Sequence, residues 1–365
     1  MVTAGRRPGR ADATRRRPRT GRVTGMGHAV PAPCEQRAMW DSFFARRYAR
    51  LPAARRIFAR SGVRTRHTVA NPVDEDVSGW STAARMQRYQ TEAMPLGKAA
   101  VTAALTDAGL DAGGIGLLAV ASCTGYVTPG IDILLARDLG MPVDVQRLMV
   151  GHMGCYAAIP GLGAAADFTA ARGRPAVLLC LELPSLHIQP DTDQMDQVVA
   201  HALFADAAAA LVVQPAGPDA GYEVLDVAAR TDESTADYMT WEVTDAGFRM
   251  GLSPRVPAVL ARHVRDVVHD LLHRNGLTPS DVDGWAVHPG GRRVLEVVGR
   301  RLELPKSALD ASYGVLRDFG NCSSATVLLV LDRLRTAGAV RAGRHAVAMA
   351  FGPGLTLYAA LLRAG

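Results

Sequence analysis

The sequence predicts an α/β fold made of two similar halves, each with a mostly parallel sheet and helices on both sides. Two nearly continuous apolar runs, residues 115–122 and 175–181, have the length of strands that are covered on both faces. Helical patterns alternate with such strands. A strand, a tight turn and a helix of small or apolar residues recur in both halves, at 146–166 and 284–334. This recurrence predicts a pseudo-duplicated core.

Composition places the chain among globular proteins of ordinary size. Its 365 residues suffice for two domains, and the 48% hydrophobic and 21% charged content is typical of soluble proteins. No stretch reaches 18 apolar residues, and the N-terminus has no apolar core like that of a secretory signal. The five cysteines lack a CxxC spacing or a paired pattern, which argues against a zinc site or a disulfide framework. A reducing, cytoplasmic location is expected.

Residues 1–27 are predicted to be a disordered, arginine-rich tail, because they lack apolar periodicity. They hold eight arginines against Asp12, a formal charge of +7, whereas the whole chain carries +6. The basic character therefore belongs to the tail, and we expect no nucleic-acid partner. An arm for anionic surfaces is one interpretation, and an inert extension is the favoured one. The arginines are Arg6, Arg7, Arg10, Arg15, Arg16, Arg17, Arg19 and Arg22.

The N-terminal half is predicted to span residues 28–213. Apolar spacing and chain breakers predict a long helix interrupted at Pro95 and a helix that begins near Ala157, ahead of Pro160. The predicted strands are 28–31, 115–122, 146–150, 175–181 and 207–213, and the predicted helices are 36–61, in two pieces, 81–110, 131–139 and the one after Cys155.

The C-terminal half is predicted to span residues 214–365. A polar connection at 231–253 is expected to follow its first strand. The predicted strands are 222–229, 284–288 and two around 351–354, and the predicted helices are 254–275, 291–302 and 324–334.

Cys155 is the candidate nucleophile. It lies between Gly154 and a segment with almost no side-chain bulk, which predicts a buried helix with a thiol at its N-terminal end. Free N–H groups and the positive end of the helix dipole favour a thiolate there, and the thiolate is the reactive form.

Two later stretches supply partners for this cysteine. His288 follows a predicted strand, and Asn321 lies in a second glycine-flanked turn. A thiolate, an imidazole and an amide suit either a Cys-His-Asn protease or an acyl-transferring condensing enzyme. The run typical of papain-like proteases is absent, and a mid-chain cysteine before a small-residue helix favours acyl transfer.

The runs around these residues resemble the signatures of type III polyketide synthases, the chalcone synthase-like enzymes. The resemblance covers residues 28–362. Ketoacyl-carrier-protein synthase III enzymes have His-Gln-Ala-Asn where this chain has His-Pro-Gly-Gly, which separates the two groups. The four runs are Gly154-Cys155-Tyr156-Ala157, His288-Pro289-Gly290-Gly291, Gly320-Asn321-Cys322-Ser323-Ser324-Ala325 and Phe351-Gly352-Pro353-Gly354-Leu355-Thr356.

The resemblance implies a thiolase-like αβαβα fold in five layers and a homodimer. It implies that Cys155 is the nucleophile that binds the acyl starter and that His288 holds the free cysteine as a thiolate–imidazolium pair. It also implies that His288 and Asn321 stabilise the enolate that malonyl-CoA forms on losing CO2. Iterative Claisen condensation and cyclisation would give a pyrone, resorcinol or naphthalene-type product. Acyl-CoA and malonyl-CoA are the implied substrates, and no cofactor or metal is implied.

Further positions are carried over from the resemblance. Phe204 matches a gatekeeper phenylalanine, and Met250 replaces a second one. Cys123 matches a second active-site cysteine of some bacterial members, and Trp241 replaces a small cavity residue and is expected to shorten or redirect the pocket. Ser323 is assigned to the cavity.

Arg56 and Arg60 match positions that contact CoA phosphates, whereas Ala53 occupies the third such position. Two alternatives stay open. One is a single-round β-ketoacyl synthase III-like enzyme that uses carrier-protein substrates, and the other is a non-catalytic scaffold paralogue.

Overall fold

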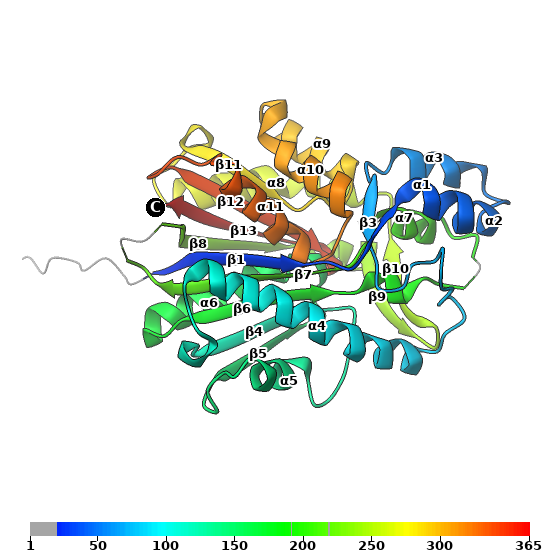
Figure 1. Ribbon diagram of the computed structural model, residues 1–365. Helices are drawn as coiled ribbons and strands as arrows, with labels where there is room; N and C mark the ends of the chain where they lie inside the picture. Colours follow the sequence, from blue (N-terminus) through cyan, green and yellow to red (C-terminus); the bar gives the residue numbers. More distant parts are fainter. Residues whose placement is uncertain (1–19, 191, 218–219) are drawn as a thin grey trace, which may run out of the picture.

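The computed structural model describes residues 20–190, 192–217 and 220–365 (Figure 1). The predicted tail therefore lies outside the described residues as far as Arg19. Its last part was predicted wrongly, because strand β1 (Gly21–Ala29) begins well before residue 28. Three glycines in β1 hide its strand character in the sequence. At Gly25 a Cβ would come within 2.3 Å of the Ala104 carbonyl oxygen, so glycine is needed where a helix crosses this strand.

One nine-stranded sheet runs through both halves in the order β11-β12-β13-β8-β1-β7-β6-β4-β5. The two halves join where β1 pairs with β8 through Arg22 with Glu223 and Val23 with Tyr222. The other strands of this sheet are β4 (Leu117–Ser122), β5 (Gln146–Gly151), β6 (Ala176–Glu182), β7 (Ala207–Pro215), β8 (Tyr222–Thr231), β11 (Val282–Val287), β12 (His345–Gly352) and β13 (Thr356–Ala364).

Strand directions repeat between the halves. β4 is parallel to β5 and β6, and β11 is parallel to β12. In each half the last strand, β7 or β13, then runs antiparallel to its neighbours. β7 reaches Pro215, two residues beyond the predicted boundary between the halves.

Alternating side chains of the sheet produce the five predicted layers. Leu178 and Cys180 of β6 face the central helices α6 (Ala158–Arg172) and α11 (Ala325–Thr336), whereas Leu179 faces the outer helix α4 (Thr82–Ala108). In the second half, α8 (Val256–His273) and α9 (Arg292–Arg301) cover the outer face (Figure 1). The order is therefore outer helix, N-terminal half of the sheet, central helices, C-terminal half of the sheet and outer helices.

Two prolines behave differently from one another. α4 continues through Pro95, so the predicted interruption was wrong. Pro160 lies at the third position of α6, where a helix needs no N–H donor, as the predicted start near Ala157 requires. The remaining helices are α1 (Gln36–Met39), α2 (Ala45–Arg47), α3 (Pro52–Arg60), α5 (Ile131–Asp138), α7 (Met195–Leu203) and α10 (Asp310–Phe319).

The polar connection predicted at 231–253 contains a hairpin instead. Its strands are β9 (Met239–Thr244) and β10 (Gly247–Leu252), with Met250 opposite Trp241. A second small pair joins β2 (Pro33–Glu35) and β3 (Thr65–His67). Among the described residues, no helix combines the length and apolar character that crossing a bilayer would require.

Candidate active site

The three candidate catalytic residues come from separate turns at one end of the sheet. Cys155 lies in a 3₁₀ turn, Gly154–Tyr156, between β5 and α6, and His288 directly follows β11. Asn321 lies between α10 and α11, where its backbone pairs with Leu203 and Ala205 beside Phe204. β5 and β11 are the two edge strands of the sheet, and the residues that follow their carboxyl ends line the same cavity.

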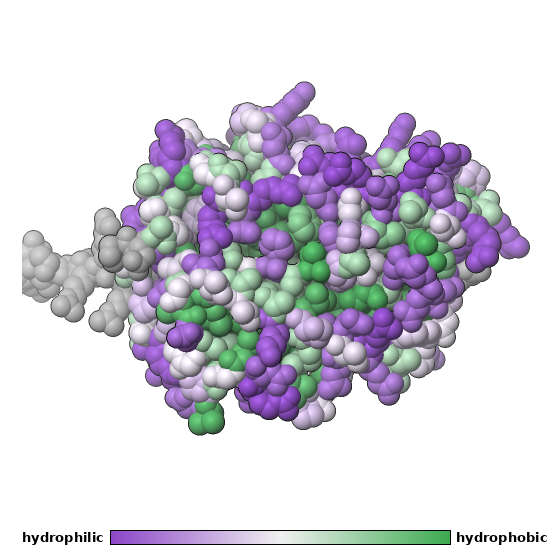
Figure 2. All heavy atoms as spheres, viewed as in Figure 1, coloured by the Kyte–Doolittle hydropathy of each residue, from purple (hydrophilic) through white to green (hydrophobic). Residues whose placement is uncertain are grey.

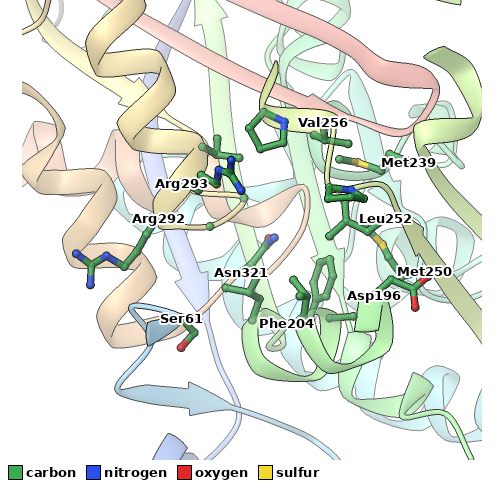
Figure 3. A pocket seen from close by; sticks show the side chains of 18 of the residues that line it. Ser61, Asp196, Phe204, Met239, Met250, Leu252, Val256, Arg292, Arg293 and Asn321 are labelled. Carbon is green, nitrogen blue, oxygen red and sulfur yellow. The ribbon is translucent and has the colours of Figure 1, made fainter. Parts of the chain in front are cut away.

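A cavity of about 1010 Å³ connects these residues with the surface (Figure 3). Cys155, His288 and Asn321 all line it, as do Phe204 and Met250. In Figure 3, Phe204 and Asn321 lie between Arg292 and Arg293 on one side and an apolar wall on the other. That wall consists of Met239, Met250, Leu252 and Val256. The sequence prediction that three distant residues meet in one open cavity thus agrees with the geometry.

Close backbone packing fixes the position of Cys155. Gly154 has φ +70, and a Cβ there would lie 2.7 Å from the Cδ of Pro353. A Cβ on Gly352 would lie 3.2 Å from the backbone N of Cys155. Burial raises the pKa of the Cys155 thiol to about 12, and a hydrogen bond with Ser323 opposes the shift. Desolvation thus opposes the thiolate form of Cys155.

His288 is buried as well. It is 1% exposed and packs edge-on against Phe351, with ring centroids 5.7 Å apart. Burial lowers its pKa to about 3. Nδ1 and Nε2 have no hydrogen-bond partner among the described residues. Burial opposes the charged form of each group taken alone, and the thiolate–imidazolium pair expected from the family resemblance stays a prediction.

Asn321 presents a hydrogen-bond donor to the cavity. Its Oδ1 accepts from the backbone N of Ser323 at 2.9 Å and from Thr326 Oγ1 at 3.4 Å. With the oxygen engaged in the turn, Nδ2 is the amide group left for a ligand. The predicted role of Asn321, donation to a thioester or enolate oxygen, requires that Nδ2 and not Oδ1 points into the cavity.

A second compartment of about 50 Å³ lies behind Cys155. Cys123, Trp241, Phe204, Met250 and Cys155 all line it, as does Ser323. The predicted cavity residues thus gather in one place. Trp241 is fixed there because its Nε1 donates to the backbone oxygen of Cys123 at 2.7 Å. The indole restricts the space in which an acyl chain could extend.

The buried carboxyl of Glu182 ties this compartment together, and sequence reasoning missed it. It accepts from Ser324 Oγ at 2.6 Å, from Thr124 Oγ1 at 2.7 Å and from the backbone N of Cys123 at 3.0 Å. Burial raises the pKa of Glu182. Burial and the nearby Glu182 carboxyl raise the pKa of the Cys123 thiol well above its usual value. Cys123 is therefore a neutral thiol, 3.5 Å from the Ser323 hydroxyl.

The mouth of the large cavity is basic. Arg60 lines it as predicted, whereas Arg56 is exposed one turn earlier on α3 and does not line it. Sequence reasoning missed Arg292 and Arg293, which open α9 at the mouth. The stem of Arg292 packs over Gly62, where a Cβ would lie 2.6 Å from its Cγ. The run of two arginines directly after the His288 motif was the available signal.

This arrangement suits acyl transfer from a long, anionic carrier. One cavity is lined by a buried thiol, an amide donor and an imidazole whose two nitrogens have no partner in the part of the chain that the structure describes. The cavity walls are largely apolar, so hydrogen bonds to a developing oxyanion would be strong there. The arginines at the mouth are suited to phosphate groups that stay near the surface.

Two family models match most of the chain. The N-terminal domain of chalcone and stilbene synthases matches residues 11–218, and the C-terminal domain of the same family matches residues 228–364.

Curated relatives resemble the chain over most of its length. The 1,3,6,8-tetrahydroxynaphthalene synthase of Streptomyces peucetius subsp. caesius is 37% identical over 85% of this chain and 83% of its own. The alpha-pyrone synthesis polyketide synthase-like Pks18 of Mycobacterium tuberculosis is 33% identical over 83% of this chain and 80% of its own.

Solved structures share the fold. The 1,3,6,8-tetrahydroxynaphthalene synthase of Streptomyces coelicolor superposes with a TM-score of 0.89 and 29% identity, over 94% of this chain and 99% of that one. PKS-I from the brown alga Ectocarpus siliculosus gives a TM-score of 0.89 and 29% identity, over 96% and 100%. The thiolase-like fold that the sequence predicted is thereby confirmed.

Proposed function

Because the chain belongs to the chalcone and stilbene synthase family, we propose that it is a type III polyketide synthase that extends an acyl-CoA starter with malonyl units. The single observation that carries the proposal is the open cavity that Cys155, His288 and Asn321 share below a basic mouth. Pyrone, resorcinol and naphthalene-type products are the candidates. The relatives named as naphthalene and pyrone synthases support this set.

Loading begins at Cys155. Its Sγ attacks the thioester carbonyl of acyl-CoA, and the Cys155 proton passes to an imidazole nitrogen of His288 as the new C–S bond forms. The CoA thiolate leaves and takes up that proton. A neutral imidazole suits this step because it offers one acceptor and one donor nitrogen, and neither has a protein partner.

Extension uses the same two donors. Malonyl-CoA loses CO2 to form the enolate of acetyl-CoA, and His288 N–H and Asn321 Nδ2 stabilise its oxygen. The enolate carbon then attacks the carbonyl carbon of the acyl group on Cys155. The new C–C bond gives a β-ketoacyl-CoA, and the broken C–S bond leaves Cys155 as a thiolate. Reloading of that product onto Cys155 starts the next round.

The cavity mouth binds CoA, and the apolar wall of the cavity holds the growing polyketide chain. Arg60, Arg292 and Arg293 bind CoA phosphates, whereas Arg56 lies one turn earlier on α3, outside the cavity lining. The growing chain lies along Met239, Met250, Leu252 and Val256, since Trp241 restricts the compartment behind Cys155 to about 50 Å³. We therefore expect a preference for short acyl starters and a chain that grows toward the apolar wall.

We further propose a cytoplasmic homodimer. β5 is an edge strand of the large sheet and leaves Leu148 and Met149 38% and 44% exposed. An apolar edge strand of this kind is suited to pairing with a second copy.

The test is incubation with labelled malonyl-CoA and a panel of acyl-CoA starters. We expect cyclised polyketides from the wild type and none from Cys155→Ala, because no other thiol lines the large cavity among the described residues. Cys34→Ala, which removes a partly exposed thiol elsewhere, is the control and should retain full activity.

Other outcomes favour the alternatives. Transfer only from malonyl-carrier protein, with a single condensation, would favour the ketoacyl synthase. Absence of both labelling and product would favour the scaffold paralogue. Product formation by Cys155→Ala would remove this residue as the nucleophile.

A further inference from the structure

Two helices at the mouth carry an unusual excess of positive charge. α3 contains Arg55, Arg56 and Arg60 and no acidic residue. α9 contains four arginines and one acid, Glu296. The four are Arg292, Arg293, Arg300 and Arg301. Figure 2 shows hydrophilic residues gathered over the side of the molecule on which α9 and α3 lie in Figure 1.

None of these seven arginines forms an ion pair among the described residues, and all seven are exposed. Arginines elsewhere on the surface are mostly neutralised. Arg88, for example, pairs with Glu75 and Glu92, and Arg344 pairs with Asp283. Seven unpaired cations repel one another unless an anionic partner lies among them.

The basic surface extends beyond what one CoA needs. Arg60, Arg292 and Arg293 already surround the cavity mouth. Arg300 and Arg301 lie at the other end of α9, about 12 Å further along the helix axis at 1.5 Å per residue. A single CoA, whose arm descends to Cys155 and whose phosphates stay at the mouth, does not require that extension.

We propose that the surface formed by α3 and α9 docks an acidic carrier protein, which delivers the starter on a phosphopantetheine arm. This inference rests on the proposed function and adds a partner to it. A carrier protein supplies both features that the site requires, a long thin arm with a terminal thioester and a negatively charged surface around it. A nucleic acid would match the charge but has no group that reaches Cys155.

The transfer balances without a further reactant. The carbonyl carbon of the acyl group forms a bond to Cys155 Sγ, and its bond to the sulfur of the carrier's arm breaks. The proton from the Cys155 thiol ends on the departing thiol of the arm. Once the carrier protein has dissociated, the cavity mouth is open to malonyl-CoA, and extension proceeds as described above.

Charges at the rim of such an interface act mainly on the association rate and depend on salt. We therefore test Arg300→Glu with Arg301→Glu, because these residues are remote from the cavity and keep the mouth arginines intact. The substrates are hexanoyl-CoA and an acidic bacterial acyl carrier protein loaded with hexanoate, each with malonyl-CoA as extender.

The expected result is a fall of about tenfold or more in kcat/KM for the loaded carrier and less than about twofold for hexanoyl-CoA. This loss of kcat/KM should become smaller as NaCl rises from 50 to 500 mM, because the Debye length falls from roughly 14 Å to 4 Å. Lys98→Glu with Arg172→Glu changes the net charge equally on α4 and α6 and is the control. It should leave both rates unchanged.

Several results would overturn the proposal. One is a wild type that turns over hexanoyl-CoA but never the loaded carrier. A second is an equal loss of rate with both substrates in the double variant. A third is micromolar binding of a DNA oligonucleotide that competes with the carrier, while the double variant has the same carrier rates as the wild type. Failure with hexanoyl-CoA itself would instead contradict the proposed function.

Discussion

At the scale of single residues, protonation is the main result. Burial raises the pKa of Cys155 to about 12 and lowers that of His288 to about 3, so desolvation opposes the charged form of each group. The sequence suggested the opposite, since a thiol at a helix N-terminus is normally acidified. Desolvation and the helix dipole act in opposite directions on Cys155, and the thiolate–imidazolium pair stays a prediction.

Trp241 is the residue that we expect to limit starter length. Trp241→Gly removes the indole from the compartment behind Cys155, so a longer acyl chain fits there. We predict that kcat/KM for decanoyl-CoA rises by about tenfold, roughly 1.4 kcal/mol of transition-state stabilisation. Steady-state kinetics over starters of graded length, with mass spectrometry of the products, measures this.

A second variant separates volume from hydrogen bonding. Trp241→Phe keeps most of the ring but loses the hydrogen bond to the Cys123 backbone oxygen. It should retain the short-starter preference. If Gly and Phe variants show the same starter profile as the wild type, this side chain does not set the length limit.

At the scale of elements, the turn between β5 and α6 holds the nucleophile. Gly154→Ala introduces a methyl group 2.7 Å from the Pro353 Cδ at a φ of +70, so the turn must shift. We predict that kcat falls by about tenfold or more, because small displacements of a reacting group are costly. Burst kinetics of Cys155 acylation is the direct measurement.

Gly173→Ala is the matched control for backbone strain. Gly173 ends α6 at a φ of +67, with open space where a Cβ would lie. This variant should lose about 1 kcal/mol of stability and keep its kcat. Equal kcat in the two variants would show that the contact with Pro353 does not position Cys155.

The elements also show what the sequence could predict. Long apolar strands such as β6 and the glycine-flanked turn at Cys155 were predictable, because their periodicity and small residues are local signals. β1 and the hairpin of β9 and β10 were not, because glycines and polar side chains hide strands that neighbouring elements complete. Glu182 was missed because its role depends on Ser324, which is distant in the sequence, whereas the arginine pair after the His288 motif was a local signal for Arg292.

At the scale of the whole molecule, buried histidines link stability to pH. Burial lowers the pKa of His187 to about 4 and those of His201 and His288 to about 3. The unfolded chain binds a proton at each near pH 6.5, and the folded chain does so only near pH 3 to 4. Between these values the unfolded state binds more protons, so each histidine makes stability fall as pH falls. Asp206, whose pKa is raised to about 7, acts in the opposite direction.

His201 allows this effect to be measured away from the catalytic residues. Its Nδ1 lies 2.5 Å from the Tyr48 hydroxyl, and it is buried. In His201→Gln, we predict that the free energy of unfolding loses about 1.4 kcal/mol less per pH unit than in the wild type between pH 6 and 4.5. Urea unfolding at fixed pH values measures the slope. His273→Gln, at an exposed position, is the control. Parallel slopes for wild type and His201→Gln would contradict the prediction.

The pairing of β1 with β8 has a mechanical consequence. Because hydrogen bonds run unbroken from one outer edge to the other, Cys155 on one side and His288 with Asn321 on the other are held by a single stiff frame. Such a frame fixes the walls of the cavity relative to Cys155. We therefore expect the volume of the cavity to limit the number of extension cycles.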